Sequence, residues 1–179
     1  MKPILTIALA LAPITAFAAS PHGHTAAPET RELRAFKLAI RKLYDLKERD
    51  FAQGRDDHIL GRFYAKDAIS VGEGEGVSMG SAEFRKVYDD VTRANHVKVR
   101  SISTFVSGKA GWDWANFYVT PTDPKEKPFS FAILFIWAKE HGRWICKGDA
   151  YAKGAFPVPD DGSAQIGHIG QERAAGTPQ

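Results

Sequence analysis

The sequence predicts a single α+β domain in which three N-terminal helices pack against one face of a curved antiparallel sheet. Two observations predict this class. Apolar residues recur at helical spacing as far as residue 94, and from His96 onward they recur with a period of two. Helices that come first and strands that follow are typical of an α+β domain, in which the helices gather on one side of the sheet.

The first predicted helix covers residues 29–53. Thr30 is a suitable N-cap, and Gly54 is a suitable stop just past the C-terminus. Large apolar side chains share one stripe of this helix, namely Leu33, Phe36, Ile40, Leu43, Tyr44 and Phe51. Lys47 falls near the middle of the same stripe, so we expect its side chain to point into the domain.

A short second helix is predicted over residues 57–64 and a third over residues 81–94, which has a clear apolar face. Between them we expect a brief strand at 68–71 and a turn of alternating Gly and Glu at 72–76. Period-two patterns then predict strands at 97–106, 111–120, 129–139 and 143–151.

The strand at 129–138 is apolar on both faces. An antiparallel strand with one face in water should instead alternate between apolar and polar residues. Either the same chain covers both faces, or one face meets a partner; with only three helices available, we expect a homodimer formed through the sheet.

The N-terminus reads as an export signal. Lys2 precedes an apolar run, and the small residues Ala16 and Ala18 predict cleavage after Ala18. We therefore expect a periplasmic or secreted protein with a signal peptide at 1–18 and no membrane insertion after cleavage. In such an oxidising compartment a lone cysteine is safest when buried, which we expect for Cys146.

The ends of the mature chain lack apolar periodicity. We expect a flexible segment at 19–28 and a disordered tail, rich in Pro, Gly and Ala, at 157–179. Residues 29–156 remain for one compact domain, which is long enough to bury a core.

The composition narrows the function classes. Lys and Arg total 24 against 21 Asp and Glu, and the basic residues are spread along the chain, which argues against nucleic-acid binding. One cysteine excludes an intramolecular disulfide and a multi-cysteine zinc site. We find no phosphate-binding glycine loop and no nucleophile elbow, and we expect no cofactor and no metal.

Three stretches resemble the nuclear transport factor 2-like superfamily, which includes the SnoaL-like proteins and the ketosteroid isomerases. They are Phe51-Ala52-Gln53-Gly54-Arg55-Asp56, Phe63-Tyr64-Ala65-Lys66-Asp67-Ala68 with Gly80 after it, and Glu140-His141-Gly142-Arg143-Trp144-Ile145. The resemblance covers about residues 33–156. It implies a cone, in which a strongly bent sheet wraps round the helices and leaves a pocket at the wide end.

The catalytic residues of the isomerases are not matched. Their first carboxylate would fall at Gly72, their second acid near Leu134, and their helix tyrosine at Lys47. This departure argues against a steroid isomerase.

Several polar residues are candidates for the pocket. Lys47 is the foremost, because a lysine removed from water can act as a base, a nucleophile or an anion clamp. With it, Asp149 and Tyr151 are the catalytic candidates. A Lys47 whose ammonium reaches water while its stem packs remains open, and so do outward-facing positions for Asp149 and Tyr151. The ligand-pocket candidates are Tyr44, Lys47, His58, Asp113, Asn116 and Tyr118. The alternation along the strands does not tell which face of the sheet points into the pocket. Glu73 and Glu75, which lie between glycines, fit a solvated turn.

Three functions remain open. The first is a pocket that binds a small, largely apolar molecule. The second is a cofactor-independent enzyme of isomerase, dehydratase or hydrolase type that uses Lys47 with a strand Asp or Tyr. The third is a non-catalytic accessory dimer with a filled cone. A Lys47 of perturbed pKa beside Asp or Tyr would favour the enzyme, and a wholly apolar pocket would favour binding.

Overall fold

The computed structural model of the protein describes residues 29–56 and 58–158. The predicted signal peptide, the segment 19–28 and residues 159–179 of the predicted tail lie outside the described residues.

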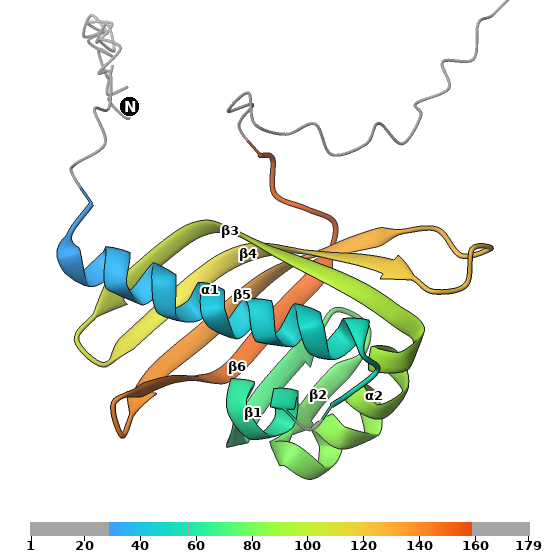
Figure 1. Cartoon of the computed structure of the whole chain (residues 1–179), viewed down its shortest axis with the longest axis horizontal. Coiled ribbons are helices and arrows are strands. Elements are labelled where there is room, and N and C mark those ends of the chain that lie inside the picture. The colour runs from blue at the N-terminus through green and yellow to red at the C-terminus, as the bar shows by residue number, and fades with distance from the viewer. Residues whose placement is uncertain (1–28, 57, 159–179) are drawn as a thin grey trace, which may run out of the picture.

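The helices and strands follow the predicted order, with differences at several boundaries (Figure 1). In chain order they are α1 (Arg31–Ala52), η1 (Ile59–Phe63), β1 (Tyr64–Gly72), β2 (Gly76–Met79), α2 (Gly80–Ala94), β3 (Asn95–Ser107), β4 (Ala110–Pro121), β5 (Phe129–Glu140) and β6 (Arg143–Lys153).

The strands form one curled six-stranded sheet in the order β2-β1-β6-β5-β4-β3. The long strands β3 to β6 pair as the predicted antiparallel meander. The sheet is nevertheless mixed, because β1 pairs with β6 in parallel. Strand β1 comes before the meander and could pair with β6 in a parallel or an antiparallel direction. The sequence pattern does not distinguish these two directions.

Helix α1 lies across the concave face of the sheet (Figure 1). The side chain of Thr30 accepts a hydrogen bond from the backbone N–H of Leu33 at 3.1 Å, as expected of an N-cap. Gly54 ends the helix with a φ of 60°, a conformation that glycine adopts without steric cost. The inward position predicted for Lys47 is confirmed, since its exposed fraction is 1%.

The segment predicted as a second helix is shorter and wound differently. It is a π-helix of five residues, η1, and Tyr64 already belongs to β1. The strand predicted at 68–71 therefore begins four residues earlier. Strand β2 was not predicted, because its four residues are too few to show alternation, and its apolar Val77 and Met79 are exposed.

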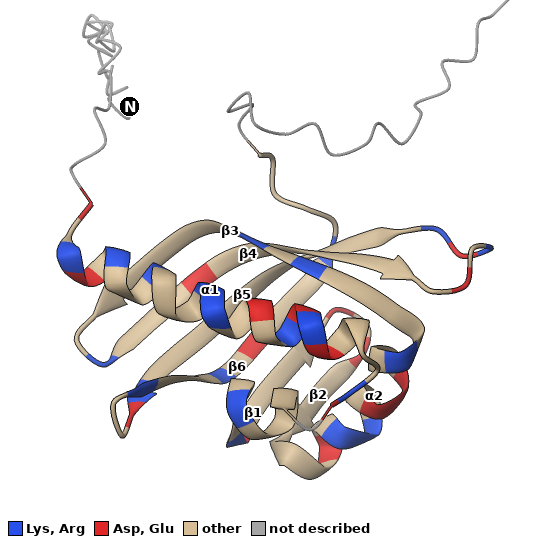
Figure 2. Cartoon of the chain, in the orientation of Figure 1, with Lys and Arg blue, Asp and Glu red and all other residues tan. Residues whose placement is uncertain are grey.

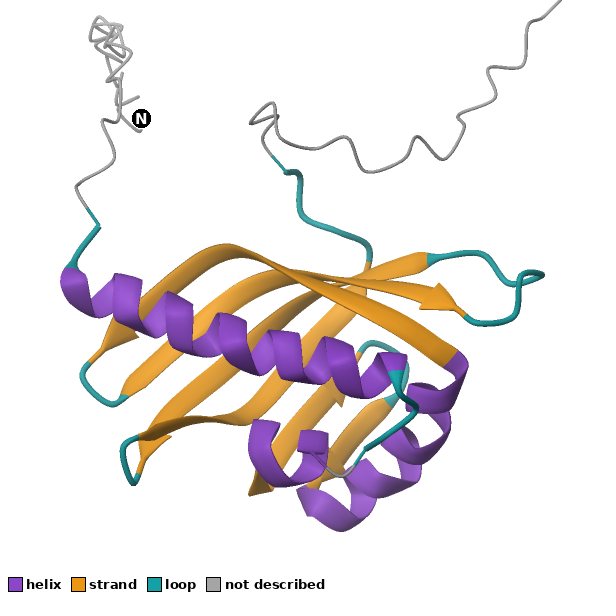
Figure 3. Cartoon of the chain, viewed as in Figure 1, coloured by secondary structure: helices purple, strands orange, loops and turns teal. Residues whose placement is uncertain are grey.

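The remaining helices gather at one end of the sheet. Figure 3 shows η1 and α2 beside β1 and β2, whereas α1 extends over the longer strands. Charged residues mark the helices and the loops, and most of the sheet ribbon carries none (Figure 2). The predicted burial of Cys146 is confirmed.

Side chains along β4 alternate between the two faces of the sheet. Asp113 on β4 meets Tyr44 of α1, so it faces inward, and its neighbours Trp112 and Trp114 face away. We call the side of the sheet away from α1 the outer face.

Candidate functional site

A cavity of about 300 Å³ lies between the C-terminal half of α1, helix α2 and the concave side of the sheet. Most of its wall is apolar. The apolar side chains that line it are Phe51, Phe84, Val87, Val91, Val97, Phe117, Val119, Phe129, Phe131 and Ile133. The polar and glycine residues that line it are Lys47, Tyr64, Ser70, Gly72, Glu75, Gly76, Ser78, Tyr88, Asn95, Asp149 and Tyr151.

Lys47 reaches the cavity from the buried stripe of α1. Its Nζ donates hydrogen bonds to the hydroxyl oxygens of Tyr64 and Tyr88, each at 2.9 Å. The same nitrogen lies 4.4 Å from the centre of the Phe63 ring, so aromatic faces supply part of the stabilisation that water would give the ammonium.

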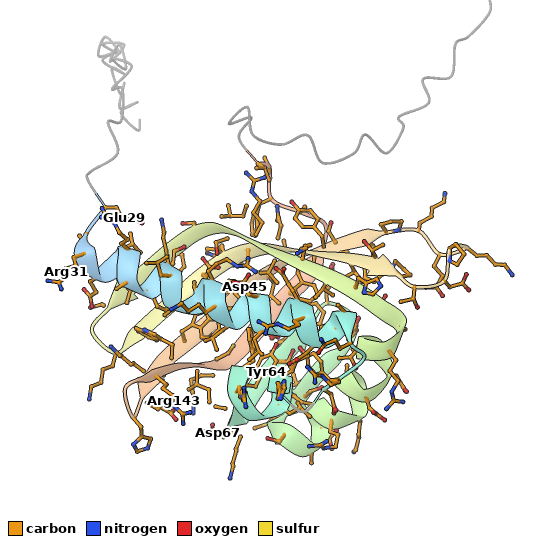
Figure 4. The ribbon with its side chains drawn as sticks, viewed as in Figure 1. Glu29, Arg31, Asp45, Tyr64, Asp67 and Arg143 are labelled. Carbon is orange, nitrogen blue, oxygen red and sulfur yellow. The ribbon has the colours of Figure 1, made fainter. Side chains whose placement is uncertain are left out.

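Asp149 completes this network from β6. Its Oδ2 accepts a short hydrogen bond from the Tyr64 hydroxyl, and its Oδ1 accepts one from Ser70 Oγ at 2.5 Å. Lys47 and Asp149 are thus connected through Tyr64, whose place at the start of β1 is labelled in Figure 4.

A bulge in β6 turns Asp149 inward. The pairing with β5 shifts between Trp137, which faces Cys146, and Ile136, which faces Gly148, so Lys147 is the extra residue. Simple alternation had put Lys147 on the same face as Asp149 and Tyr151. Instead, its Nζ donates to Asp67 Oδ1 at 2.6 Å on an exposed site.

Burial shifts the pKa of every titratable group in the network. Removal from water lowers the pKa of Lys47 to about 8, an effect that the charge of Asp149 partly offsets. Removal from water also raises the pKa of Asp149, and the charge of Lys47 partly offsets that effect. The pKa of Tyr64 and that of Tyr88 are raised by burial first and by Asp149 second.

Because the pKa of Lys47 is lowered, part of the protein has a neutral lysine near physiological pH. With a pKa of about 8, roughly one molecule in ten carries an uncharged amine at pH 7. The hydroxyl of Tyr64 bonds both charged groups, so a proton can pass between Lys47 and Asp149 along existing hydrogen bonds.

Tyr151 and Glu75 lie at the exposed edge of the cavity. The Tyr151 hydroxyl donates to Glu75 Oε2 at 2.6 Å, which joins β6 to the turn after β1. Gly72 makes this possible, because a Cβ at that position would lie 2.5 Å from the Tyr151 hydroxyl oxygen. A side chain at position 72 would therefore require the Tyr151 phenol to move.

Five of the predicted pocket residues do not line the cavity. Tyr44 and Asp113 form a separate buried cluster under α1, in which Asp113 Oδ2 accepts from the Tyr44 hydroxyl at 2.8 Å. Asp113 also accepts from Ser101 Oγ and Thr104 Oγ1, each at 2.7 Å, so hydroxyl donors hold the carboxyl in place.

The other three predicted pocket residues, His58, Asn116 and Tyr118, also lie away from the cavity. His58 precedes η1, and its Nδ1 lies 3.0 Å from Asp50 Oδ1. Asn116 and Tyr118 follow the parity of Trp114 and point to the outer face. There the Asn116 side chain bonds both the backbone N–H and the backbone C=O of Phe156, at 2.7 and 3.0 Å.

Sequence reasoning did not select Tyr64, Tyr88 and Ser70. Tyr88 could have been selected from the sequence, because its phenol lies on the apolar face of α2, just as the amine of Lys47 lies on the apolar face of α1. Tyr64 was assigned to the end of a helix, and Ser70 to a strand of unknown parity, so neither could be placed against Asp149.

The described part of the chain contains no group of three His, Cys, Asp or Glu side chains placed to hold a metal ion. Within those same residues, no helix combines the length and the apolar character needed to cross a membrane.

Comparison of the sequence with models of protein families finds no match. Comparison with curated protein sequences finds none either.

Comparison with solved structures finds many similar folds. A protein of unknown function with a cystatin-like fold from Nostoc punctiforme is 17% identical, with a TM-score of 0.57 over 66% of this chain and 90% of that one. A ketosteroid isomerase-like protein from Erwinia carotovora atroseptica is 17% identical, with a TM-score of 0.56 over 72% of this chain and 100% of that one. LinA is 15% identical, with a TM-score of 0.55 over 71% of this chain and 92% of that one.

Proteins described as similar to nuclear transport factor 2 are among the other matches. At such low identity the likeness concerns the fold and leaves the function open. The chain has the nuclear transport factor 2-like α+β fold, in which a curled, unclosed sheet wraps round the helices.

Proposed function

We propose that the cavity binds a small, largely apolar molecule that carries a polar group. The observation that supports this most directly is the uneven wall of the cavity. Phenylalanine and valine side chains supply most of the surface, and the polar groups of Lys47, Tyr88 and Asp149 are gathered at its buried part. Such a wall suits ligands that are mostly apolar and are oriented by a few hydrogen bonds.

The charges of the network favour a neutral ligand. Lys47 and Asp149 carry opposite charges and are joined through Tyr64, so neither is left without a partner inside the domain. A charged ligand would add an uncompensated charge to a site that is largely removed from water, which is costly.

Native mass spectrometry of the mature protein, purified gently from its own compartment, tests the proposal. We expect the folded protein to carry a discrete extra mass. Val87→Trp should remove that mass, because Val87 is an exposed lining residue and the indole would fill the entrance. Leu38→Trp, at an exposed position of α1 outside the cavity, is the matched control and should retain the ligand. Retention of the same mass by Val87→Trp would contradict the proposal.

A second candidate is a cofactor-independent enzyme that transfers a proton to or from the bound molecule. The hydrogen-bonded series from Lys47 through Tyr64 to Asp149 favours it, together with the lowered pKa of Lys47. Deuterium exchange into the ligand identified above, followed by NMR, tests this activity. Lys47→Met and Asp149→Asn should each slow the exchange by about 100-fold or more, and unchanged exchange in both variants would exclude it.

The accessory dimer with a filled cone would have no cavity, so the cavity volume favours binding over that alternative. We also propose a homodimer formed through the outer face, where Phe105 and Ile136 are 50% and 48% exposed. From the N-terminal sequence we propose export to the periplasm or the cell exterior.

A further inference from the structure

The amine of Lys47 differs from the other lysines in its partners. Within residues 29–56 and 58–158, Lys37, Lys98 and Lys147 form ion pairs with carboxylates at the surface. Lys47 instead donates to two phenol oxygens and is surrounded by aromatic rings.

We infer that Lys47 is a nucleophile that binds a small apolar aldehyde covalently, as an imine, in the cavity. The inference rests on the proposed function, because it requires that the cavity admit a small apolar molecule. It deepens that proposal by naming an aldehyde as the polar group of the ligand.

The geometry around Nζ suits an attacking amine. A neutral lysine has two N–H groups and one lone pair. The two phenol oxygens, each 2.9 Å away, accept both N–H groups, so the lone pair stays available for a carbon atom. Burial lowers the pKa of Lys47 to about 8, which makes the neutral amine accessible near physiological pH.

The neighbours of Lys47 can carry the protons that imine formation moves. First, the ammonium gives a proton to Tyr64, and Tyr64 gives its own proton to Asp149. The Tyr64 hydroxyl then turns its new proton from the amine to the Tyr88 oxygen, 3.0 Å away, which frees the lone pair of the amine. The freed amine then attacks the aldehyde carbon. The carbonyl oxygen becomes an alkoxide, and one proton passes from the new N–C nitrogen to that oxygen through the Tyr88 hydroxyl, giving a carbinolamine.

Loss of water completes the reaction. Asp149 returns its proton through the tyrosine hydroxyls to the carbinolamine oxygen, the C–O bond breaks, and water leaves. The overall change is one ammonium and one aldehyde giving one protonated imine and one water, with no oxidant or reductant consumed. Asp149 ends as the carboxylate, and the raised pKa that burial gives it suits a group that accepts and returns a proton.

The wall of the cavity selects the kind of aldehyde. The rings of Phe51, Phe84, Phe117 and Phe131 line it, so a flat unsaturated or aromatic aldehyde fits better than a hydrated sugar. A volume of about 300 Å³ is at the small end for ligand pockets, which favours a molecule of about the size of cinnamaldehyde.

Reductive trapping with cinnamaldehyde tests the inference. The mature full-length protein is incubated with the aldehyde at pH 8 and treated with sodium borohydride, and the product is examined by intact mass and peptide mapping. We expect one adduct per chain, with the mass of the aldehyde less one oxygen atom, located on Lys47. The yield at Lys47 should exceed that at Lys42, an exposed lysine of the same helix, by at least about tenfold.

Two variants and one second ligand separate the possible results. Lys47→Arg should lose the adduct, and Lys42→Arg should keep it; peptide mapping of the unaltered chain gives the same answer if Lys47→Arg fails to fold.

Cinnamyl alcohol, which has the same shape and no carbonyl group, is measured in parallel by native mass spectrometry. Retention of the alcohol without trapping of the aldehyde at Lys47 would overturn the inference and leave the binding proposal standing. Retention of neither compound would overturn the inference and count against the binding proposal. Labelling spread evenly over the surface lysines would also overturn the inference.

Discussion

Lys47 and Asp149 are joined through the hydroxyl of Tyr64. Tyr64 accepts from Lys47 Nζ at 2.9 Å and donates to Asp149 Oδ2. The two charged groups come from the first helix and the last strand, and the tyrosine comes from β1, which pairs in parallel with that strand. This parallel pairing brings the phenol between the two charges.

Tyr64→Phe should therefore destabilise the fold more than Tyr88→Phe. Tyr64 hydrogen-bonds both charged groups, whereas Tyr88 bonds Lys47 and Tyr64. Hydrogen bonds to charged groups contribute about 1.5–3 kcal/mol each, so we expect a loss of about 3 kcal/mol in the free energy of unfolding for Tyr64→Phe and about half of that for Tyr88→Phe. Urea denaturation at pH 7 measures both. An equal effect of the two substitutions would contradict the central place of Tyr64.

Stability should rise with pH between 7 and 9. The pKa of Lys47 is about 8 in the folded chain and has its ordinary value of 10.5 in the unfolded chain, so the unfolded chain binds more protons over this range. The free energy of unfolding should consequently increase by about 1 kcal/mol from this group. Urea denaturation at the two pH values measures the change.

Lys47→Met is the control for this pH dependence. The variant lacks the titrating amine and keeps Asp149, whose raised pKa acts in the opposite sense, because it removes stability as the pH rises through it. We expect the variant to show a flat or falling free energy of unfolding from pH 7 to 9. A rise equal to that of the unaltered protein would assign the effect to other groups.

The fold was largely predictable from the sequence, because helical and period-two patterns depend on which side chains are buried along each segment. Lys47 was predictable for the same reason, since a charged residue on an apolar stripe is an exception to that pattern. Asp149 was among the candidates, but the sequence left open which face of the sheet it occupies, and Tyr64 was not a candidate. The inward turn of Asp149 depends on the extra residue Lys147 in β6, and the position of Tyr64 depends on the parallel pairing of β1. Both are long-range features of backbone pairing that local periodicity does not record.

The outer face provides a test of the proposed homodimer. Ile136 is apolar, half exposed and on the face opposite to α1, so a second copy would bury it. We expect sedimentation velocity to show a dimer at micromolar concentration, Ile136→Lys to shift it to a monomer, and Leu38→Lys on α1 to leave it unchanged. A monomeric unaltered protein would contradict the dimer. The segment around Phe156, which Asn116 binds, would then be what covers part of the outer face.

Asp113 and Asp149 form a matched pair for separating stability from ligand binding. Each is a buried carboxylate that accepts hydrogen bonds from hydroxyl groups, and burial raises the pKa of each. Only Asp149 of the two lines the cavity. Asp113→Asn and Asp149→Asn should both lower the free energy of unfolding, by about 2 kcal/mol, because an amide has one acceptor oxygen in place of two.

The two variants should differ in ligand retention. Asp113 bonds Tyr44, Ser101 and Thr104 outside the cavity, so Asp113→Asn should retain the ligand mass in native mass spectrometry. Asp149→Asn removes the charge that balances Lys47. It also replaces a carboxylate oxygen that accepts the Tyr64 proton by an amide that can donate, so the polar part of the cavity rearranges. Ligand retention should therefore fall by about tenfold or more. Equal losses in the two variants would mean that ligand retention reports general destabilisation, and they would remove Asp149 from the binding site.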